Sequence, residues 1–351
     1  MNSKASSTDT VGVVGAGSFG LALANLLAAN RPVLLYARRP EVVEELQRTR
    51  RHGGREILPE IELTNDLEAL AHRCELVFPV VPSTAFPEML HQLSPHLRPS
   101  HKVIHGTKGL FVYLPEGETL QSVKQLRRED VRTMSELIQE ETVVRRVGCV
   151  AGPNLAGEIF EGQPAATVVA SPFEEVIREG QGALRSGRFR VHGNHDLFGI
   201  ELAGVLKNIM AIAAGILHGL GYGDNTRALL VTRGLAEMIY VGRSLGADVR
   251  SFLGLAGIGD LVATCSSPRS RNFTVGYRLG QGEALDDILA SMEEIAEGLN
   301  TVSIVRALTV GQGISAPITL TLYRTLFEDM DIARGMRLLM EFPFSEDVDF
   351  I

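Results

Sequence analysis

Short apolar runs of strand length recur through the first half of the chain. Helical or polar segments separate most of them, and this alternation is typical of a parallel, doubly wound sheet. The runs are TVGVV (10–14), VLLY (33–36), ELVFPVV (75–81), KVIHGT (102–107), VGCVAG (147–152) and ATVVAS (166–171). The pattern therefore predicts an α/β domain in this half.

The pattern changes near residue 196. In residues 198–220 and 225–246 the apolar positions recur at helical spacing, and no clear β-branched run persists. The stretch VHGNHD (191–196) is the nearest feature to a linker. With 351 residues, and at about 150 residues per domain, two domains are expected. We predict a sheet domain over 1–195 and an all-α domain over 196–351.

The composition excludes several classes of protein. The chain has 34 Lys and Arg against 42 Asp and Glu, a net charge of −8, which argues against a nucleic-acid-binding surface. The longest strictly apolar run, Ile209–Leu217, is shorter than the roughly 20 residues of a spanning helix, so no membrane insertion is expected. Because Cys74, Cys149 and Cys265 lie far apart in the sequence, we expect neither a disulfide framework nor a metal site. Unpaired cysteines also favour a cytoplasmic location. The strongly charged segment 114–142 is expected to be a solvated helix beside the sheet.

A glycine motif follows the first apolar run. Gly15, Gly17 and Gly20 in GAGSFG have the spacing G-x-G-x-x-G, between a predicted strand and a predicted helix. In such a motif the first glycine permits a tight turn, the second lets backbone approach a pyrophosphate, and the third lets helix and strand pack closely. The helix N-terminus then offers N–H groups to phosphate. We therefore predict a Rossmann-like dinucleotide-binding domain; a glycine-rich turn without a ligand is the alternative.

The residues after the second strand bear on which dinucleotide binds. NAD-specific folds tend to carry an acidic residue there, whereas this chain has Arg38 and Arg39. Arginines can hold a 2′-phosphate. The sequence thus predicts that NADP is accepted, along with NAD, unless both arginines are ordinary solvated charges.

Several polar residues in or near apolar segments are candidates for carbonyl reduction, which needs a proton donor and groups that fix the substrate. Lys108 lies just past a predicted strand, and Gly152 and Asn154 follow another. Lys207 lies in an apolar helical stretch, with Gly204 and Ala203 on its face. It either snorkels to solvent or is desolvated, and desolvation would lower the pKa of its ammonium group toward an acid/base range.

Three further segments carry polar groups. Asp260 follows a glycine-rich turn and is either a helix cap or a functional carboxylate. Ser270, Arg271 and Asn272 are a candidate phosphate clamp, because Arg binds phosphate oxygens in a bidentate manner. Glu297 can cap a helix or bind a ribose hydroxyl.

Taken in order, these segments resemble those of the bacterial-type NAD(P)-dependent glycerol-3-phosphate dehydrogenases. The resemblance spans nearly the whole chain, and the block 201–272 is its most specific part. The segments that carry it are GAGSFG (15–20), ARR (37–39), TKG (107–109), AGPN (151–154), ELAGVLKNIMAIAAGI (201–216), GLGYGDNTRALLVTRGLAEM (219–238), GLAGIGDLVATC (254–265), SRN (270–272) and EG (297–298). The chain departs from the family at Phe19, where Trp is frequent, at Asn154-Leu155, where Ser/Thr-Phe is common, and at His105, where a small residue is usual.

The resemblance implies a site in which NADP or NAD meets a phosphorylated triose. Lys207 would be the catalytic acid/base, with Asp260 orienting it or binding a substrate hydroxyl, and Lys108 adding electrostatic stabilisation. The nucleotide would contact Ser18, Phe19, Arg38, Lys108, Ala156, Arg271, Ile295 and Glu297. The substrate would contact Lys108, Gly152, Asn154, Lys207, Asp260, Ser270, Arg271 and Asn272.

Two other functions remain open at this point. One is a related two-domain NAD(P) reductase acting on a β-hydroxy acid or ketoacid, and the other is a non-catalytic, dinucleotide-sensing regulator. NADPH oxidation measured with dihydroxyacetone phosphate, with ketoacids and without substrate separates the three. The sequence leaves the oligomeric state open, a homodimer included.

Overall fold

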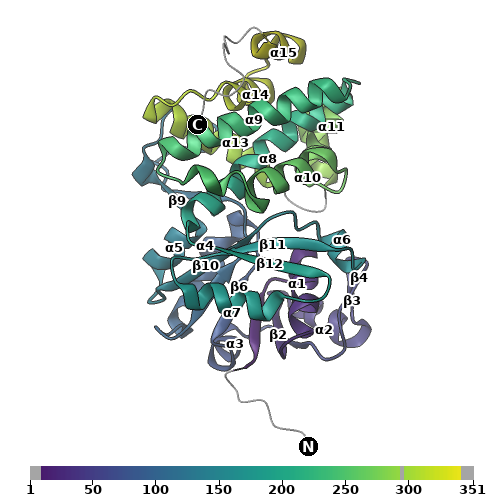
Figure 1. The fold of residues 1–351 in the computed structure, drawn as a ribbon, viewed down its shortest axis with the longest axis vertical. Helices are drawn as coiled ribbons and strands as arrows, with labels where there is room; N and C mark the ends of the chain where they lie inside the picture. Colours follow the sequence, from purple (N-terminus) through teal and green to yellow (C-terminus); the bar gives the residue numbers. More distant parts are fainter. Residues whose placement is uncertain (1–8, 293–295, 341–351) are drawn as a thin grey trace, which may run out of the picture. The chain divides into compact units, whose positions relative to one another are not determined.

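The chain forms two compact units in a computed structural model that describes residues 9–292 and 296–340 (Figure 1). The first unit consists of Met1–Lys108 and Met134–Leu197. The second consists of Gly109–Thr133 and Phe198–Ile351. Each unit has its own hydrophobic core.

A mostly parallel sheet forms the centre of the first unit. Its spatial order is β12-β11-β10-β7-β6-β1-β2-β5. The strands are β1 (Val11–Val14), β2 (Val33–Tyr36), β5 (Glu62–Thr64), β6 (Leu76–Pro79), β7 (Lys102–His105), β10 (Arg146–Ala151), β11 (Ala165–Ala170) and β12 (Phe189–Asn194). All six predicted strands are present, but β11 runs antiparallel to β10. The expected linker 191–196 is wrong in its first four residues, which form the end of β12 and pair with β11.

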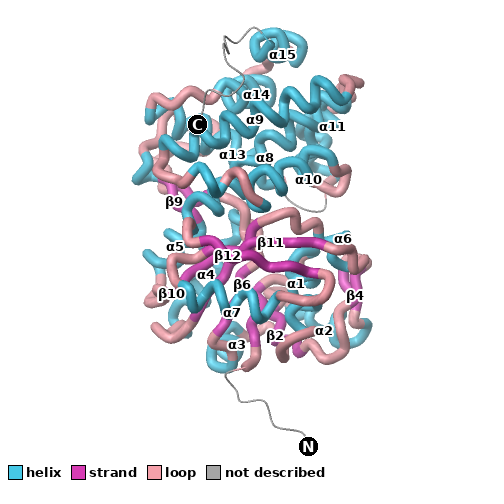
Figure 2. The backbone as a smooth tube through the Cα atoms, viewed as in Figure 1, coloured by secondary structure: helices cyan, strands magenta, loops and turns pink. Residues whose placement is uncertain are grey.

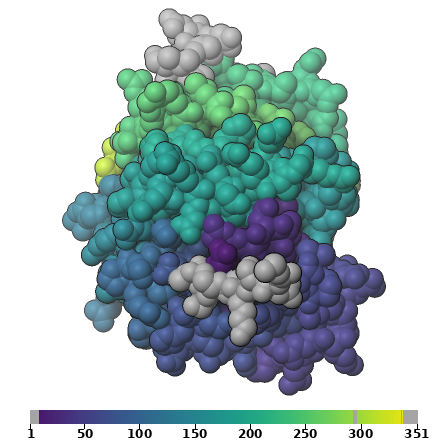
Figure 3. Space-filling model, turned by 60° about the horizontal axis from the view of Figure 1, so that its bottom comes forward, coloured from purple at the N-terminus to yellow at the C-terminus, as the bar shows by residue number. Residues whose placement is uncertain are grey.

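Helices cover both faces of this sheet (Figure 2). They are α1 (Ser18–Ala28), α2 (Pro40–Thr49), α3 (Leu67–Arg73), α4 (Phe86–Leu93), α5 (Met134–Glu141), α6 (Ala156–Phe160) and α7 (Glu174–Leu184), and a small hairpin of β3 (Arg51–His52) and β4 (Arg55–Glu56) follows α2. The helix α1 contacts α7, whereas α4 contacts α3 and α5. The Nδ2 group of Asn30, just after α1, donates hydrogen bonds to the carbonyl oxygens of Ala183 at 2.8 Å and Arg185 at 3.0 Å. Figure 3 shows the N-terminal part of the chain, in purple, beside a later part of the chain, in teal.

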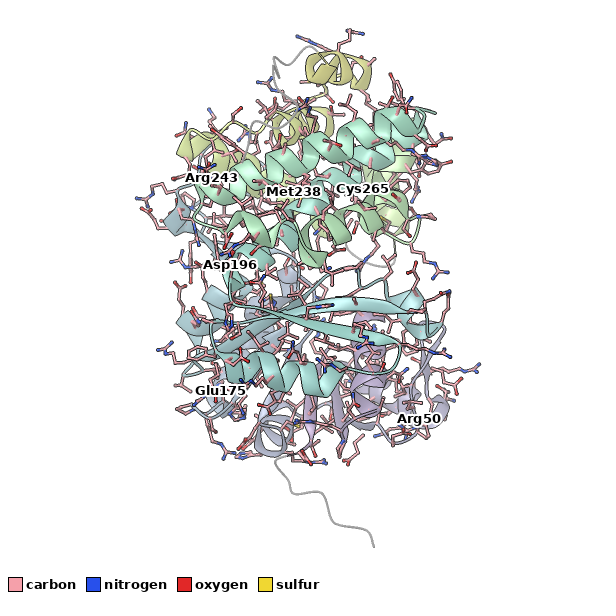
Figure 4. The ribbon with its side chains drawn as sticks, viewed as in Figure 1. Arg50, Glu175, Asp196, Met238, Arg243 and Cys265 are labelled. Atoms are coloured by element: carbon pink, nitrogen blue, oxygen red, sulfur yellow. The ribbon has the colours of Figure 1, made fainter. Side chains whose placement is uncertain are left out.

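The second unit is helical. It contains α8 (Leu197–Gly219, of which the first residue belongs to the first unit), α9 (Asp224–Ser244), α10 (Asp260–Ser266), α11 (Arg271–Gly280), α12 (Leu285–Ser291), α13 (Glu297–Gln312), α14 (Pro317–Phe327) and α15 (Ile332–Met340). Met238 on α9 and Cys265 on α10, labelled in Figure 4, belong to its core. Among the described residues, α8 alone is long and apolar enough to cross a membrane, and 94% of its most apolar window is buried inside the protein. It is thus a core helix.

Glycines let α8 and α11 pack with their backbones in contact. A Cβ atom on Gly276 of α11 would lie 1.9 Å from the carbonyl oxygen of Ile212, and one on Gly215 of α8 would lie 2.1 Å from that of Phe273. Atoms cannot approach so closely, so a side chain at either position would push the helices apart. This crossing fixes α8 relative to the start of α11.

The segment 109–133 packs with the helical unit, contrary to the predicted boundary. It contains the hairpin of β8 (Leu110–Val112) and β9 (Val131–Thr133), and Val123 and Leu126 are buried in the helical core. The backbone N–H of Leu126 donates to the carbonyl oxygen of Ala307 on α13, at 2.9 Å. The expected solvated helix over 114–142 is also wrong, because within it only α5 is α-helical. Val123, Leu126 and Val131 of this segment are buried, and their burial overrides its charged composition.

Candidate functional site

The glycine motif forms a tight turn between β1 and α1. Gly15 has a φ of +122°, in the region that favours glycine, and a Cβ on Gly20 would lie 1.9 Å from the carbonyl oxygen of Gly15. Gly17 precedes α1, and among the described residues nothing lies within 4 Å of a Cβ placed there. Because α1 has no side-chain cap, its first N–H groups are suited to a pyrophosphate. This cradle fits a dinucleotide.

Two other predicted cofactor residues lie in the first unit near this turn in sequence. The ring of Phe19 packs on Gly106, where an added Cβ would lie 2.8 Å from the ring. Arg38 follows β2, and its side chain is 68% exposed with its guanidinium 3.7 Å from the carboxylate of Glu88. So exposed a pair is weak, and the guanidinium can exchange this carboxylate for a phosphate.

Lys108, Gly152 and Asn154 come together at the ends of β7 and β10. The ammonium of Lys108 donates to the carbonyl oxygen of Gly152 at 3.0 Å, and Gly152 has a φ of +145°. The Nδ2 group of Asn154 donates to Oγ1 of Thr167 at 2.9 Å. The Oδ1 atom of Asn154 is buried and has no hydrogen-bond partner among the described residues. A buried, unsatisfied acceptor of this kind suits a ligand that carries a hydroxyl. Ala156 begins α6 two residues later.

Lys207 is buried in the helical unit beside Asp260 and Thr264. Its Nζ atom donates to Oγ1 of Thr264 at 2.7 Å and lies 3.3 Å from Oδ1 of Asp260. The Thr264 hydroxyl in turn donates to Oδ1 of Asp260 at 3.0 Å. The side chains of Lys207 and Asp260 are only 6% and 3% exposed. Lys207 therefore does not snorkel: it is held in the interior by a carboxylate and a hydroxyl.

Asp260 is not a plain helix cap, because Gly259 occupies the cap position and the carboxylate points to Lys207. The preceding residues, Leu255–Gly259, form a π-helical turn that leads into α10. Thr264 was missed from the sequence, although its place one helical turn after Asp260 puts both on the same face. Burial raises the pKa of the neighbouring Cys265 thiol to about 12, so this thiol stays neutral.

The proposed clamp residues lie at the start of α11. The Ser270 hydroxyl accepts a hydrogen bond from the backbone N–H of Phe273 at 3.3 Å, which caps the helix. Arg271 is the exposed first residue of α11, and Asn272 is buried. Glu297 is the first residue of α13, which has no side-chain cap on Ala296. Ile295 lies outside the described residues.

Comparison with known proteins decides the family. Residues 10–177 match the family model for the N-terminus of NAD-dependent glycerol-3-phosphate dehydrogenase, and residues 196–337 match the model for its C-terminus. The glycerol-3-phosphate dehydrogenase [NAD(P)+] of Azotobacter vinelandii is 41% identical over 348 residues, covering 97% of each chain. The chain belongs to the NAD(P)-dependent glycerol-3-phosphate dehydrogenase family. It is thus an oxidoreductase that uses NAD or NADP, as predicted.

A second relative and a solved structure of the glycerol-3-phosphate dehydrogenase family are similar to this chain over nearly its whole length. The protein of that name from Ectopseudomonas mendocina is 40% identical over 346 residues, covering 97% of each chain. The crystal structure of glycerol-3-phosphate dehydrogenase from Coxiella burnetii has a TM-score of 0.85 at 33% identity, covering 96% of this chain and 100% of that one. The predicted fold class, a Rossmann-like sheet plus a helical C-terminal domain, is therefore confirmed.

Proposed function

We propose that the chain reduces dihydroxyacetone phosphate to sn-glycerol 3-phosphate, reversibly, with Lys207 as general acid/base. The observation that carries this proposal is the buried contact of the Lys207 ammonium with Asp260 and Thr264. A buried ammonium beside a carboxylate and a hydroxyl is held in a fixed orientation. Such preorganisation suits a proton donor for one carbonyl oxygen.

When bound, the reduced nicotinamide supplies the hydride that the ketone carbon accepts. Lys207 holds a proton at Nζ and donates it to the carbonyl oxygen as that oxygen becomes an alkoxide. Thr264 and Asp260 keep the ammonium oriented and balance its charge. In the reverse direction Lys207 takes the proton from the product hydroxyl.

The remaining candidate residues bind the two ends of the substrate. Ser270, Arg271 and Asn272 hold its dianionic phosphate, because a guanidinium and side-chain donors match phosphate oxygens. The unsatisfied Oδ1 atom of Asn154 accepts a hydrogen bond from the substrate hydroxyl. Lys108, which already points to the carbonyl of Gly152, adds positive charge where negative charge develops.

Arg38 favours the 2′-phosphate of NADP. Its exposed guanidinium pairs only with the exposed Glu88. Arg38→Ala should weaken NADPH binding about tenfold and leave NADH binding within twofold, since a charge-assisted contact contributes about 1.5 kcal/mol or more. An unchanged dissociation constant for NADPH would refute this role.

The test of the function is NADPH oxidation with dihydroxyacetone phosphate, with ketoacids and without substrate. Only the triose phosphate should give turnover. Lys207→Ala should lower kcat by roughly 10²–10⁴-fold, the typical loss of a general acid, with NADPH affinity nearly intact. Arg271→Ala should mainly raise the substrate KM, because it removes a binding contact. Full turnover by Lys207→Ala would remove this residue from its role.

Three further proposals concern the oligomeric state of the enzyme, its location in the cell and the use of its product. A homodimer is supported by the large apolar side chains Leu229 and Tyr240, which are 40% and 45% exposed on α9. Light scattering that gives the monomer mass of 38.1 kDa would refute it. A cytoplasmic location is supported by three buried cysteines that form no disulfide, and it is checked by cell fractionation. The product would supply the backbone of glycerophospholipids, and depletion of the enzyme should then slow phospholipid labelling.

A further inference from the structure

The helix α13 begins without a cap of its own. Ala296, at the cap position, has no side-chain acceptor for the first N–H groups. The acceptor comes instead from α11, where Oδ1 of Asn272 receives the backbone N–H of Gly298 at 2.9 Å. This hydrogen bond is buried, so its loss would leave a polar group unsatisfied.

Three helices meet at Gly298. A Cβ on this glycine would lie 2.7 Å from Oδ1 of Asn272, 2.8 Å from Cδ1 of Ile212 and 3.0 Å from the carbonyl oxygen of Asn208. Asn208 directly follows Lys207 on α8. The start of α13 is therefore packed against the helix of the proposed acid/base and against the proposed phosphate clamp.

The hydrogen bond to Gly298 also fixes which way the Asn272 amide faces. Only an oxygen can accept from an N–H group, so Oδ1 points to α13 and Nδ2 forms the other end. No acceptor for Nδ2 is found among the residues that the structure describes. The free end is thus a donor, the type of group that binds a phosphate oxygen.

We propose that Asn272 is a positioning residue that couples the cofactor to the substrate: one end of its amide places Glu297 by capping α13, while the other binds the substrate phosphate. The proposal rests on the proposed function and on the prediction that Glu297 binds a ribose hydroxyl of the cofactor. It goes beyond a contact to substrate, because it makes NADPH affinity depend on Asn272 before any substrate is bound.

Two substitutions separate the two ends of the amide. Asn272→Asp keeps an acceptor for Gly298 but presents a charged oxygen to the phosphate. It should leave the dissociation constant of NADPH within threefold of wild type and raise the KM of dihydroxyacetone phosphate at least thirtyfold. Asn272→Ala removes both ends and should weaken NADPH binding about tenfold, the effect of one lost buried hydrogen bond.

A double substitution tests whether Asn272 acts through Glu297. Glu297→Ala should weaken NADPH binding, and adding Asn272→Ala should weaken it no further, because the second change then has nothing left to misplace. The matched control is Thr274→Val, which removes hydrogen bonds at the start of α11 (to the carbonyl oxygens of Pro268 and Ser270); among the described residues, the Thr274 hydroxyl forms no hydrogen bond with α13. It should leave NADPH affinity unchanged.

The deciding measurements are NADPH fluorescence titration without substrate and amide hydrogen exchange at the start of α13. Exchange of the Gly298 amide should be at least tenfold faster in Asn272→Ala and unchanged in Asn272→Asp. Equal exchange in all three proteins, or multiplying effects of Asn272→Ala and Glu297→Ala, would overturn the proposal. If Glu297→Ala leaves NADPH affinity unchanged, Glu297 does not bind the ribose and the coupling of cofactor to substrate is refuted. Turnover of dihydroxyacetone phosphate would still test the proposed function independently.

Discussion

Glu237 of α9 is a buried carboxylate that caps another helix. Its Oε2 atom accepts the backbone N–H of Ile318 at 2.6 Å, and Oε1 accepts the backbone N–H and the hydroxyl of Thr319 at 2.9 and 2.6 Å. These are the first turns of α14, whose own cap position, Ala316, has no side-chain acceptor. Burial raises the pKa of Glu237 from its ordinary 4.5 to about 7, although the hydrogen bonds from Thr319 and Ile318 act in the opposite direction.

This pKa makes stability depend on pH. A carboxyl whose pKa is higher in the folded protein contributes stability that is fully present below its unfolded pKa and is lost as pH rises through the folded value. For Glu237 that window runs from about 4.5 to about 7. Between pH 5 and pH 8 the loss amounts to about 2–3 kcal/mol. For a unit of this size that corresponds to roughly 5–10 °C in Tm.

The assay compares wild type with Glu237→Gln by thermal unfolding between pH 5 and pH 8. Gln cannot ionise, so the Tm of wild type should fall relative to that of the variant by roughly 5–10 °C as pH rises. The exposed Glu44 supplies the control, since Glu44→Gln should track wild type throughout. A constant Tm difference between wild type and Glu237→Gln would refute the reasoning. Hydrogen exchange in α14 localises the effect.

Three further predictions test the site and the packing. Thr264→Val should lower kcat about 10- to 100-fold and Thr264→Ser should restore most of it, as steady-state kinetics would show; equal kcat in all three would contradict an orienting role. Gly276→Ala should destabilise the protein by more than about 3 kcal/mol in denaturant unfolding, because its Cβ would meet the Ile212 carbonyl. Gly182→Ala on α7 should instead stabilise the protein by up to about 1 kcal/mol, because among the described residues nothing lies within 4 Å of a Cβ placed there. Leu126→Ala should cost about 2–5 kcal/mol if segment 109–133 is part of the helical core, and a cost below 1 kcal/mol would refute that assignment.

The sequence predicted what depends on local pattern. Apolar runs located six of the eight strands of the main sheet to within a few residues, and the glycine spacing located the turn before α1. The small neighbours on the face of Lys207 left two alternatives, a side chain that reaches solvent and one that is buried, and the structure shows the buried one. Each of these signals lies within a short stretch of chain.

The missed features depend on contacts between distant residues. Thr264 reaches Lys207 across 57 positions and Asn272 reaches Gly298 across 26, so neither pairing leaves a local signal. The composition of the end of β12 predicts a linker because Gly193 and Asn194 are typical of loops. It is a strand because pairing with β11 at the sheet edge overrides those preferences.

The two units are interleaved in sequence. The chain passes from one to the other at 108/109, 133/134 and 197/198. No single cut therefore separates a sheet protein from a helical one: a fragment starting at Phe198 would lack Val123 and Leu126 and expose the apolar side of α13 that they cover. Exchanging the helical unit between relatives therefore requires transplanting the internal segment 109–133 together with everything from Phe198 onward.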